Sequence, residues 1–408
     1  MKKTVLQRYA HLIAKTGVNV QPGQEVVVRA GLDQPEFVQM VVEECYKLGA
    51  SLVTVDWEYQ PLAKTRYRYA KTNVLAKVEE WELAKIKHRV ETLPAMIYLE
   101  SEDPDGLAGM NQKKFAAVQQ KRYPILKPFR DEMENKYQWC IAAVPGKKWA
   151  KKVFPELRVS AAVEKLWEMI LMTSRADGED PVAAWDAHNA DLAARCEYLN
   201  NLHPVELRYH SKNGTDFTVG LIPEGQFEGG SAKTLSGTVY NPNIPSEEAF
   251  TSPMKGKAEG TVVATRPLSY QGQLIENFSL TFHEGKVVSL QAEKNQALLE
   301  KMVAMDENSC YLGECALVPY DSPIRNSEVT FLNTLFDENA CCHLALGMGF
   351  AECIRGYETK TLEECRALGV NDSIIHVDFM IGSEDLSIDA VDAEGKLHPI
   401  FRDGNWAF

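Results

Sequence analysis

Short apolar runs alternate with segments of helical periodicity in the first part of the chain. Four of these runs predict buried strands: 25–29, 52–56, 95–99 and 139–144. Between the first two runs, apolar residues recur at the spacing of one helix face, namely Phe37, Met40, Val41, Cys45 and Leu48. Asp33 is placed to cap this helix before Pro35, and Gly49 is placed to end it. The order strand, helix, strand predicts an open α/β sheet with parallel strands over roughly the first 160 residues.

The pattern changes twice after this region. It is helical from about 159 to 202, with a break at Gly178 and Pro181. After Pro204, short strands and tight turns dominate, and Asn213-Gly214 is a strong hairpin signal. We expect strands at 205–210, 216–221, 260–265, 278–282, 287–290, 386–390 and 396–400, and helices at about 291–306 and 361–368. The second half is therefore predicted to be β-rich and mostly antiparallel.

These patterns predict a multidomain protein of mixed α/β and α+β class. An N-terminal open α/β sheet domain precedes a β-rich C-terminal domain with helices. A length of 408 residues suggests two or three domains, and the best division is 1–195 and 196–408. No GxGxxG or GxxxxGK[ST] motif follows a predicted strand, which argues against nucleotide binding.

Charge and cysteine content narrow the class of protein further. The formal net charge is −13, with 57 acidic and 44 basic residues, which argues against a nucleic-acid partner. No segment approaches the ~18 uninterrupted apolar residues of a membrane span, and the basic start lacks the apolar core of a signal peptide. The nine cysteines form no CxxC pair and are expected to be reduced, packed thiols. We expect a cytoplasmic protein with no nucleic-acid or membrane partner.

The run IIHVDFMIG places His376 and Asp378 two residues apart in an apolar, β-prone segment. Residues i and i+2 of a strand point to the same face, so the two side chains are expected to lie side by side. A buried carboxylate is usually paired or bound to a metal, because leaving it alone is costly. From this run alone, a hydrogen-bonded His–Asp pair and a metal site have equal weight.

Three further blocks place acidic or histidine residues in apolar or turn contexts. They are NIPSEEAFT with Glu248, YLGECALVP with Glu314, and LFDENACCHLALG with Glu338 and His343. Each residue has an ordinary alternative: a turn carboxylate, a helix cap or arginine partner, an exposed helix position and a hydrogen-bonded core histidine, respectively. Together, four carboxylates and two imidazoles would suit a pair of divalent cations, which is hydrolytic chemistry. Spacing in the sequence does not establish that they converge.

Taken in order, the blocks NIPSEEAFTSP, LGECALVP, DENACCHLALG and HVDFMIGS closely resemble the thermophilic-type metallo-aminopeptidases of family M29, the group of aminopeptidases T and S. The opening TGVNVQPGQEVVV is also similar to that family, so the resemblance covers nearly the whole chain. It implies an N-terminal α/β domain, a C-terminal metal-binding catalytic domain and a homodimer. It also implies removal of N-terminal residues from peptides by water activated with two divalent ions (Zn, Co or Mn).

Carried over residue by residue, the resemblance implies metal ligands at Glu248, Glu314, Glu338, His343, His376 and Asp378. Glu248 is preferred to Glu247 because relatives often have Gly-Glu there, and Glu314 is expected to bridge the ions. Glu247 itself is left without a role. Where the family has a tyrosine whose phenol is proposed to hydrogen-bond the developing oxyanion, this chain has Phe350. Tyr357 could replace that phenol only if its loop folds back, so no catalytic side chain is assigned.

Two other functions stay open at this stage. One is a metal-dependent hydrolase of dipeptides or amino-acid amides. The other is a weakly active or non-catalytic metal-binding homologue, which the missing hydroxyl at Phe350 keeps under consideration.

Overall fold

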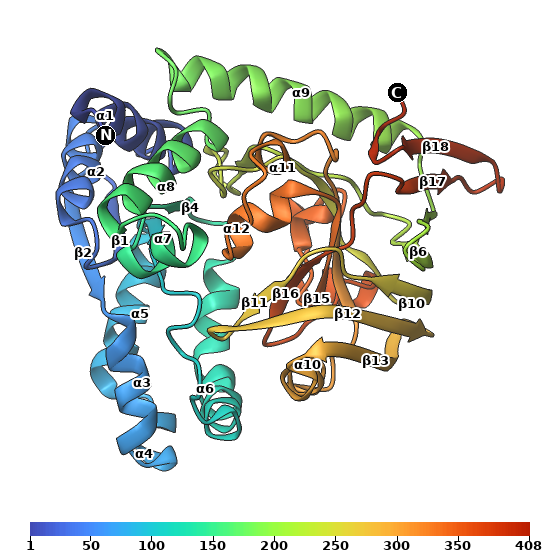
Figure 1. Ribbon diagram of the computed structural model, residues 1–408, viewed down its shortest axis with the longest axis horizontal. Helices are drawn as coiled ribbons and strands as arrows, with labels where there is room; N and C mark the ends of the chain where they lie inside the picture. The colour runs from blue at the N-terminus through green and yellow to red at the C-terminus, as the bar shows by residue number, and fades with distance from the viewer. The chain divides into compact units, whose positions relative to one another are not determined.

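The computed structural model describes all residues from Met1 to Phe408 (Figure 1). They form two compact units, one of Met1–His188 with Ser231–Ser246 and one of Asn189–Gly230 with Glu247–Phe408. The chain therefore leaves the first unit within α9 (Pro181–Asn201) and returns to it once. The division predicted from the sequence, 1–195 and 196–408, has a single boundary. It therefore does not separate Ser231–Ser246 from the rest of the second half.

The first unit is built on a parallel four-stranded sheet with the order β2-β1-β3-β4. Its strands are β1 (Glu25–Gly31), β2 (Leu52–Glu58), β3 (Ala95–Glu100) and β4 (Trp139–Ala143). Its helices are α1 (Lys3–Leu12), α2 (Pro35–Lys47), α3 (Gln60–Tyr69), α4 (Thr72–Ala76), α5 (Glu80–Thr92), α6 (Gln112–Met133), α7 (Lys147–Val153) and α8 (Val159–Thr173). The predicted open parallel sheet is confirmed.

Three helices pack around an aromatic cluster in this unit. Tyr9 of α1, Phe37 of α2 and Trp167 of α8 are buried, with ring centroids 5.2 to 6.4 Å apart. The hydroxyl of Tyr9 also donates a hydrogen bond to the carbonyl oxygen of Ala143 in β4, at 3.2 Å. The apolar face that helical spacing predicted for α2, which includes Phe37, therefore packs against α1 and α8.

The predicted capping role of Asp33 is wrong. Gln34 occupies the position before α2, and no side chain caps that helix. The Asp33 carboxylate instead accepts hydrogen bonds from the Ser101 hydroxyl at 3.1 Å and from the backbone N–H of Lys147 at 3.4 Å. Asp33 thus joins the end of β1 to the segments after β3 and β4, contacts that local sequence does not reveal.

The second unit contains a nine-stranded antiparallel sheet, ordered β11-β12-β10-β6-β5-β17-β18-β19 with β13 paired to β12. Its strands are β5 (Glu206–His210), β6 (Asp216–Leu221), β10 (Pro253–Val263), β11 (Leu268–Tyr270), β12 (Gln273–His283), β13 (Lys286–Lys294), β17 (Ser387–Val391), β18 (Leu397–Arg402) and β19 (Asn405–Trp406). The β-rich, antiparallel character is confirmed. The helix predicted at 291–306 is only α10 (Gln296–Val303), because β13 continues to Lys294 in its pairing with β12.

A second antiparallel sheet, ordered β16-β15-β14-β9, lies in the same unit. It consists of β9 (Ala249–Thr251), β14 (Leu312–Leu317), β15 (His343–Gly347) and β16 (His376–Met380). One face of this sheet belongs to the main apolar cluster of the unit, through Cys315, Leu317, Leu344, Leu346, Val377 and Phe379. The opposite face is therefore the only one on which its polar side chains can lie.

The remaining short elements are α11 (Pro323–Asn326), α12 (Thr334–Asp337) and α13 (Leu362–Leu368) in the second unit, and β7 (Ala232–Lys233) and β8 (Val239–Tyr240) in the first. All nine cysteines are free thiols and only Cys310 is partly exposed, as predicted.

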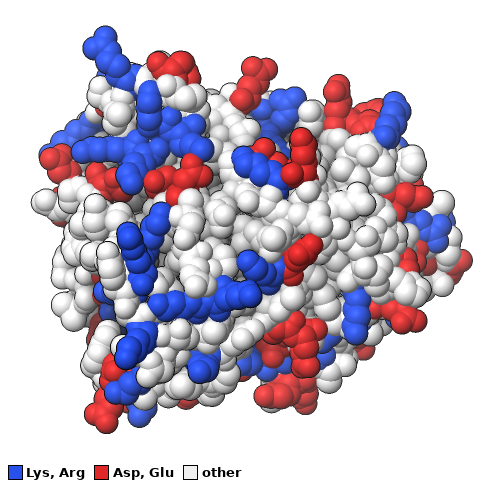
Figure 2. Space-filling model, turned by 60° about the horizontal axis from the view of Figure 1, so that its bottom comes forward, with Lys and Arg blue, Asp and Glu red and all other residues white.

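None of the helices combines the length and apolar character that a membrane crossing needs. Figure 2 shows one face of the molecule, where basic and acidic side chains are interspersed.

Candidate metal centre

The polar face of the β16-β15-β14-β9 sheet is set by its register. Residues directly paired across an antiparallel ladder project to the same face. Glu314 of β14 pairs with Ala345 of β15, and Ala345 pairs with Asp378 of β16. His376 pairs with Gly347, the next position on that face. Three of the predicted ligands therefore project side by side, and the small residues between them leave the space above the central strand open.

A β-bulge explains why Glu314 faces this way. Leu312 pairs with Leu346 and Glu314 pairs with Ala345, so the register shifts between them at Gly313. Leu312 can therefore join the apolar cluster while Glu314, two residues later, projects to the other side. Gly313 is required here, because a Cβ at this position would lie 2.0 Å from the carbonyl oxygen of Met348.

His343 and Glu248 reach the same face from the other end of the sheet. His343 lies two residues before Ala345 and pairs with Ala316, which in turn pairs with Phe250 of β9. Glu248 precedes Phe250 by two residues. Strand alternation therefore brings both side chains to the face that carries Glu314.

Five of the six predicted residues come together in two groups that share one member. The ligand atoms of Glu248, Glu314 and His343 all lie within 4.8 Å of one another, as do those of Glu314, His376 and Asp378. Nε2 of His343 is 3.1 Å from Oε2 of Glu248, and Nε2 of His376 is 3.1 Å from Oε2 of Glu314. Glu314 is the one residue that belongs to both groups, and its bridging role stays a prediction.

The sixth residue, Glu338, lies close by but outside both groups. It begins the single helical turn Glu338–Ala340 that follows α12, and it is buried, so the exposed helix position considered from the sequence does not apply. Its pKa is raised well above the usual value, first by burial and then by the carboxylates of Asp378, Glu248 and Glu314. Glu338 therefore contributes to the same concentration of negative charge.

Backbone carbonyls orient both imidazoles. Nδ1 of His376 lies 2.8 Å from the carbonyl oxygen of Met348, and Nδ1 of His343 lies 3.3 Å from that of Cys341. Because a carbonyl oxygen only accepts, each Nδ1 carries the proton. Each Nε2 is then the atom that faces the carboxylates, which is the arrangement typical of metal-binding histidines.

The carboxylates are too close together to be charged without compensation. Burial raises the pKa of Glu314 to about 7, Glu248 and Asp378 also raise it, and His376 acts against them. For His343, burial lowers the pKa, but Glu248 and the other carboxylates raise it to about 9. Without another cation, the cluster is stable only when protons neutralise it.

Divalent cations are an alternative to protons as the compensating charge. The four carboxylates Glu248, Glu314, Glu338 and Asp378 and two neutral imidazoles carry a formal charge of −4, which two divalent cations cancel. Imidazole nitrogens and carboxylate oxygens also form a donor set that suits Zn²⁺, Co²⁺ or Mn²⁺. The residues present therefore fit a pair of divalent ions.

The His–Asp pair considered from the sequence is present within this cluster. Nε2 of His376 lies 3.1 Å from Oδ1 of Asp378, but it is equally close to Glu314. A single imidazole nitrogen shared by two carboxylates is not a closed hydrogen-bonded couple. The pair is therefore one part of a larger acidic centre.

Asn339 is a residue that the sequence patterns did not single out. Its side chain is fully buried. Its Oδ1 accepts the backbone N–H of Glu247 at 2.7 Å, and its Nδ2 donates to the carbonyl oxygen of Leu335 at 2.9 Å and to Oε1 of Glu338 at 3.4 Å. Asn339 thus ties the turn that carries Glu338 to the segment that carries Glu248.

The aromatic side chain at position 350 lies directly beside the centre. The Phe350 ring centroid is 4.9 Å from that of His376 and 5.5 Å from that of Phe250. Its backbone N–H donates to the hydroxyl of Ser252 at 2.7 Å, which fixes its position. An apolar ring therefore occupies a place where a tyrosine would bring a hydroxyl group.

Tyr357 packs elsewhere in the same unit. It lies against an apolar cluster that contains Ile222, Ile354 and Val370. Its pKa is raised to about 12, first by burial and then by three carboxylates outside the predicted ligand set, those of Glu352, Glu358 and Glu228. The contacts of Tyr357 are therefore with residues outside the predicted ligand set.

Comparisons with known proteins cover the whole chain. The family model described as thermophilic metalloprotease (M29) matches residues 2–406. Aminopeptidase AmpS of Bacillus subtilis is 42% identical over 404 residues, 99% of this chain and 98% of that protein. Aminopeptidase 2 of Geobacillus stearothermophilus is 41% identical over 99% of this chain and 98% of its own length. The structure of wild-type AmpT from Thermus thermophilus matches with a TM-score of 0.89 and 36% identity, covering 100% of both chains.

Replacing Asn339 by alanine is expected to weaken metal binding about 10- to 100-fold, as loss of a group that orients metal ligands typically does. The variant removes the acceptor of the Glu247 N–H and the donor to the carboxylate of Glu338. Competition with a fluorescent chelator measures the dissociation constant. The matched control is Asn326→Ala, which removes an exposed side chain that hydrogen-bonds only Asp321. Equal metal affinity in both variants would contradict the role of Asn339.

Proposed function

Because the chain belongs to the M29 family of thermophilic metalloproteases, we propose that it is an aminopeptidase that removes N-terminal residues from peptides. The reaction uses two divalent cations at the candidate metal centre. The observation that carries the proposal is the position of Glu314, which shares its carboxylate between two groups of ligand atoms. The names of the relatives, which are aminopeptidases, support the same activity.

The ligand assignment follows the two groups. Glu248 and His343 would hold one cation, His376 and Asp378 the other, and Glu314 would bridge them. Glu338 would complete the set from its turn beside Asp378. Paired divalent ions polarise a carbonyl group and lower the pKa of bound water, which is the chemistry that peptide hydrolysis needs.

The chain's own residues prepare this chemistry in three ways. The carbonyl groups of Met348 and Cys341 hold the two imidazoles in one tautomer and one orientation. Ala345 and Gly347 keep the centre of the face open for ligand and substrate atoms. A carboxylate near the ions would hold the free N-terminal amine of a peptide, which would restrict cleavage to the first bond.

The proposal also includes the homodimer and the cytoplasmic location that were expected from the sequence. The identity of the cation is also part of the proposal, and the mixed nitrogen and oxygen donor set supports Zn²⁺, Co²⁺ or Mn²⁺ over the hard cations Ca²⁺ and Mg²⁺.

Removal and return of metal tests the proposed activity. The chelated protein is expected to lose peptide hydrolysis, and one or more of Zn²⁺, Co²⁺ and Mn²⁺ should restore it. The assay compares a peptide with a free N-terminus with its N-acetylated form. Only the free peptide should be cleaved, one residue at a time. Cleavage of the blocked peptide at a similar rate would rule out an aminopeptidase, and activity confined to dipeptides or amino-acid amides would favour that narrower hydrolase.

The His376→Ala variant should lose both bound metal and peptide hydrolysis, because Nε2 of His376 is close to two of the proposed carboxylate ligands. Elemental analysis gives the metal content, and release of N-terminal amino acids gives the activity. His283→Ala is the control, since this histidine is exposed and pairs only with Glu259. Full activity and metal content in His376→Ala would refute the ligand assignment.

A weakly active homologue is the second candidate, and Phe350 is the observation that favours it. The ring lies beside His376 but has no hydroxyl to donate to a developing oxyanion. One such donor is worth about 10²–10³ in rate where it acts. Phe350→Tyr is therefore expected to raise kcat for peptide hydrolysis with little change in metal content. If steady-state kinetics show no gain, the hydroxyl is not the missing element.

A further inference from the structure

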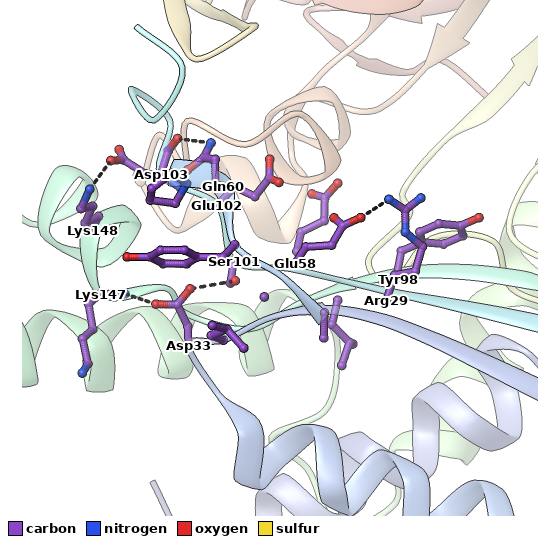
Figure 3. Close-up of a pocket in the computed structure, with 17 residues that line it drawn as sticks. Arg29, Asp33, Glu58, Gln60, Tyr98, Ser101, Glu102, Asp103, Lys147 and Lys148 are labelled. Carbon is purple, nitrogen blue, oxygen red and sulfur yellow. Dashed lines mark hydrogen bonds and ion pairs between the residues drawn. The ribbon is translucent and has the colours of Figure 1, made fainter. Parts of the chain in front are cut away.

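A separate cavity of about 370 Å³ lies in the first unit (Figure 3). Its walls include Gly31 at the end of β1, Glu58 at the end of β2 and Glu100 at the end of β3. In the order β2-β1-β3-β4, the strands β2 and β3 lie on opposite sides of β1. The strand order therefore reverses between β1 and β3. Open α/β sheets bind ligands where the strand order reverses, outside the carboxyl ends of the strands. The cavity occupies this place, and ligand pockets are typically ~300–1,000 Å³.

The cavity has a defined wall around Ser101. A Cβ at Gly146 would lie 1.9 Å from the carbonyl oxygen of Ser101, and a Cβ at Gly31 would lie 2.5 Å from its hydroxyl. Asp33 closes this wall by accepting hydrogen bonds from the Ser101 hydroxyl and from the N–H of Lys147 (Figure 3). The two glycines therefore allow three segments of the chain to meet at the side of the cavity.

The lining carries more negative than positive charge. Its five carboxylates are those of Asp33, Glu58, Glu100, Glu102 and Asp103, and its three cationic side chains are those of Arg29, Lys147 and Lys148. Two of the cations are already paired. Arg29 contacts Glu58, and Lys148 lies 3.5 Å from Asp103. An anionic ligand such as a phosphate would therefore face a net negative wall, and Asp33 already accepts the N–H of Lys147 at the start of α7.

Glu102 is the one acidic group of the wall for which the structure records no hydrogen bond or ion pair, and no dashed line reaches it in Figure 3. Its pKa is raised, first by removal from solvent and then by the carboxylates of Glu100 and Glu58, while Arg29 acts in the opposite direction. The residue as a whole is exposed, so a ligand can reach the carboxylate. A cation placed here would compensate this repulsion.

We propose that this cavity binds the ammonium group of a small organic amine through Glu102. Tyr59 also lines the cavity, and an aromatic ring can contribute to binding such a cation. Free amino acids, short peptides and diamines share this chemistry. The site lies in the unit that contains none of the proposed metal ligands, so the inference goes beyond the proposed function and does not depend on it.

Calorimetric titration of the full-length chain tests the inference. The His376→Ala variant serves as the background, so that an amine bound at the metal centre does not obscure the result. L-Leucine and 1,4-diaminobutane are the amine probes, and N-acetyl-L-leucine is the same amino acid without its ammonium group. At least one amine should bind with a stoichiometry of one, and the acetylated compound should not. Which amine binds distinguishes an amino-acid site from a diamine site.

Substitutions at Glu102 locate the site. Glu102→Gln is expected to weaken amine binding about tenfold or more, because it removes the charge from the hydrogen-bond acceptor. Glu102→Asp keeps the charge and should keep measurable binding. Glu91→Gln is the control, since this exposed glutamate on α5 is not part of the cavity. Equal binding of N-acetyl-L-leucine, unchanged affinity in Glu102→Gln, or no amine binding at millimolar concentration would each overturn the proposal.

Peptide hydrolysis separates this site from the metal centre. With His376 intact, Glu102→Gln should hydrolyse peptides as the unaltered chain does, while amine binding in the cavity is weakened. A parallel loss of hydrolysis would contradict a separate site. If the proposed function failed instead, hydrolysis would be absent from both the unaltered chain and the variant, whatever their amine binding.

Discussion

The mutual repulsion of four neighbouring, buried carboxylates is the constraint on which the second unit depends. Glu248, Glu314, Glu338 and Asp378 are all buried, and the two imidazoles among them carry too little charge to compensate. Burial makes each negative charge costly, and proximity adds to this cost. A protein retains such an arrangement where function requires it, and a pair of divalent cations is the partner that balances the charge. The proposed hydrolytic function follows from this requirement.

The sheet that carries most of these groups also packs its other face into the apolar core. Strand alternation sends Leu344 and Phe379 into the apolar core, and the intervening positions to the polar face. Small residues such as Ala345 keep that face open. Backbone carbonyl groups accept hydrogen bonds from Nδ1 of the two imidazoles and so fix their orientation. Asn339 then joins the two segments that are not held by the ladder. The rigid apolar side of the sheet thus positions the reactive side, which is what a preorganised site requires.

The sequence predicted much of this because the strongest signals are local. The two-residue spacing of His376 and Asp378 is enough to place them on one face, and the apolar runs are enough to define the parallel sheet. The row that joins Glu314 to Asp378 depends on register, and the bulge at Gly313 reverses the face that simple alternation from Leu312 would give. Long-range contacts are likewise absent from local patterns, which is why Asn339 was missed. The helix expected from residue 291 is shortened because pairing with β12 keeps those residues in β13.

The central claim is that Glu314 bridges two metal ions, and anomalous X-ray diffraction tests it most directly. Crystals of the protein prepared with Zn²⁺ would be measured on both sides of the zinc absorption edge. The account predicts two anomalous peaks about 3.5–4 Å apart, one on each side of the Glu314 carboxylate. One ion should contact Glu248 and His343, and the other should contact His376. A single peak, or peaks that leave Glu314 uncoordinated, would contradict the account.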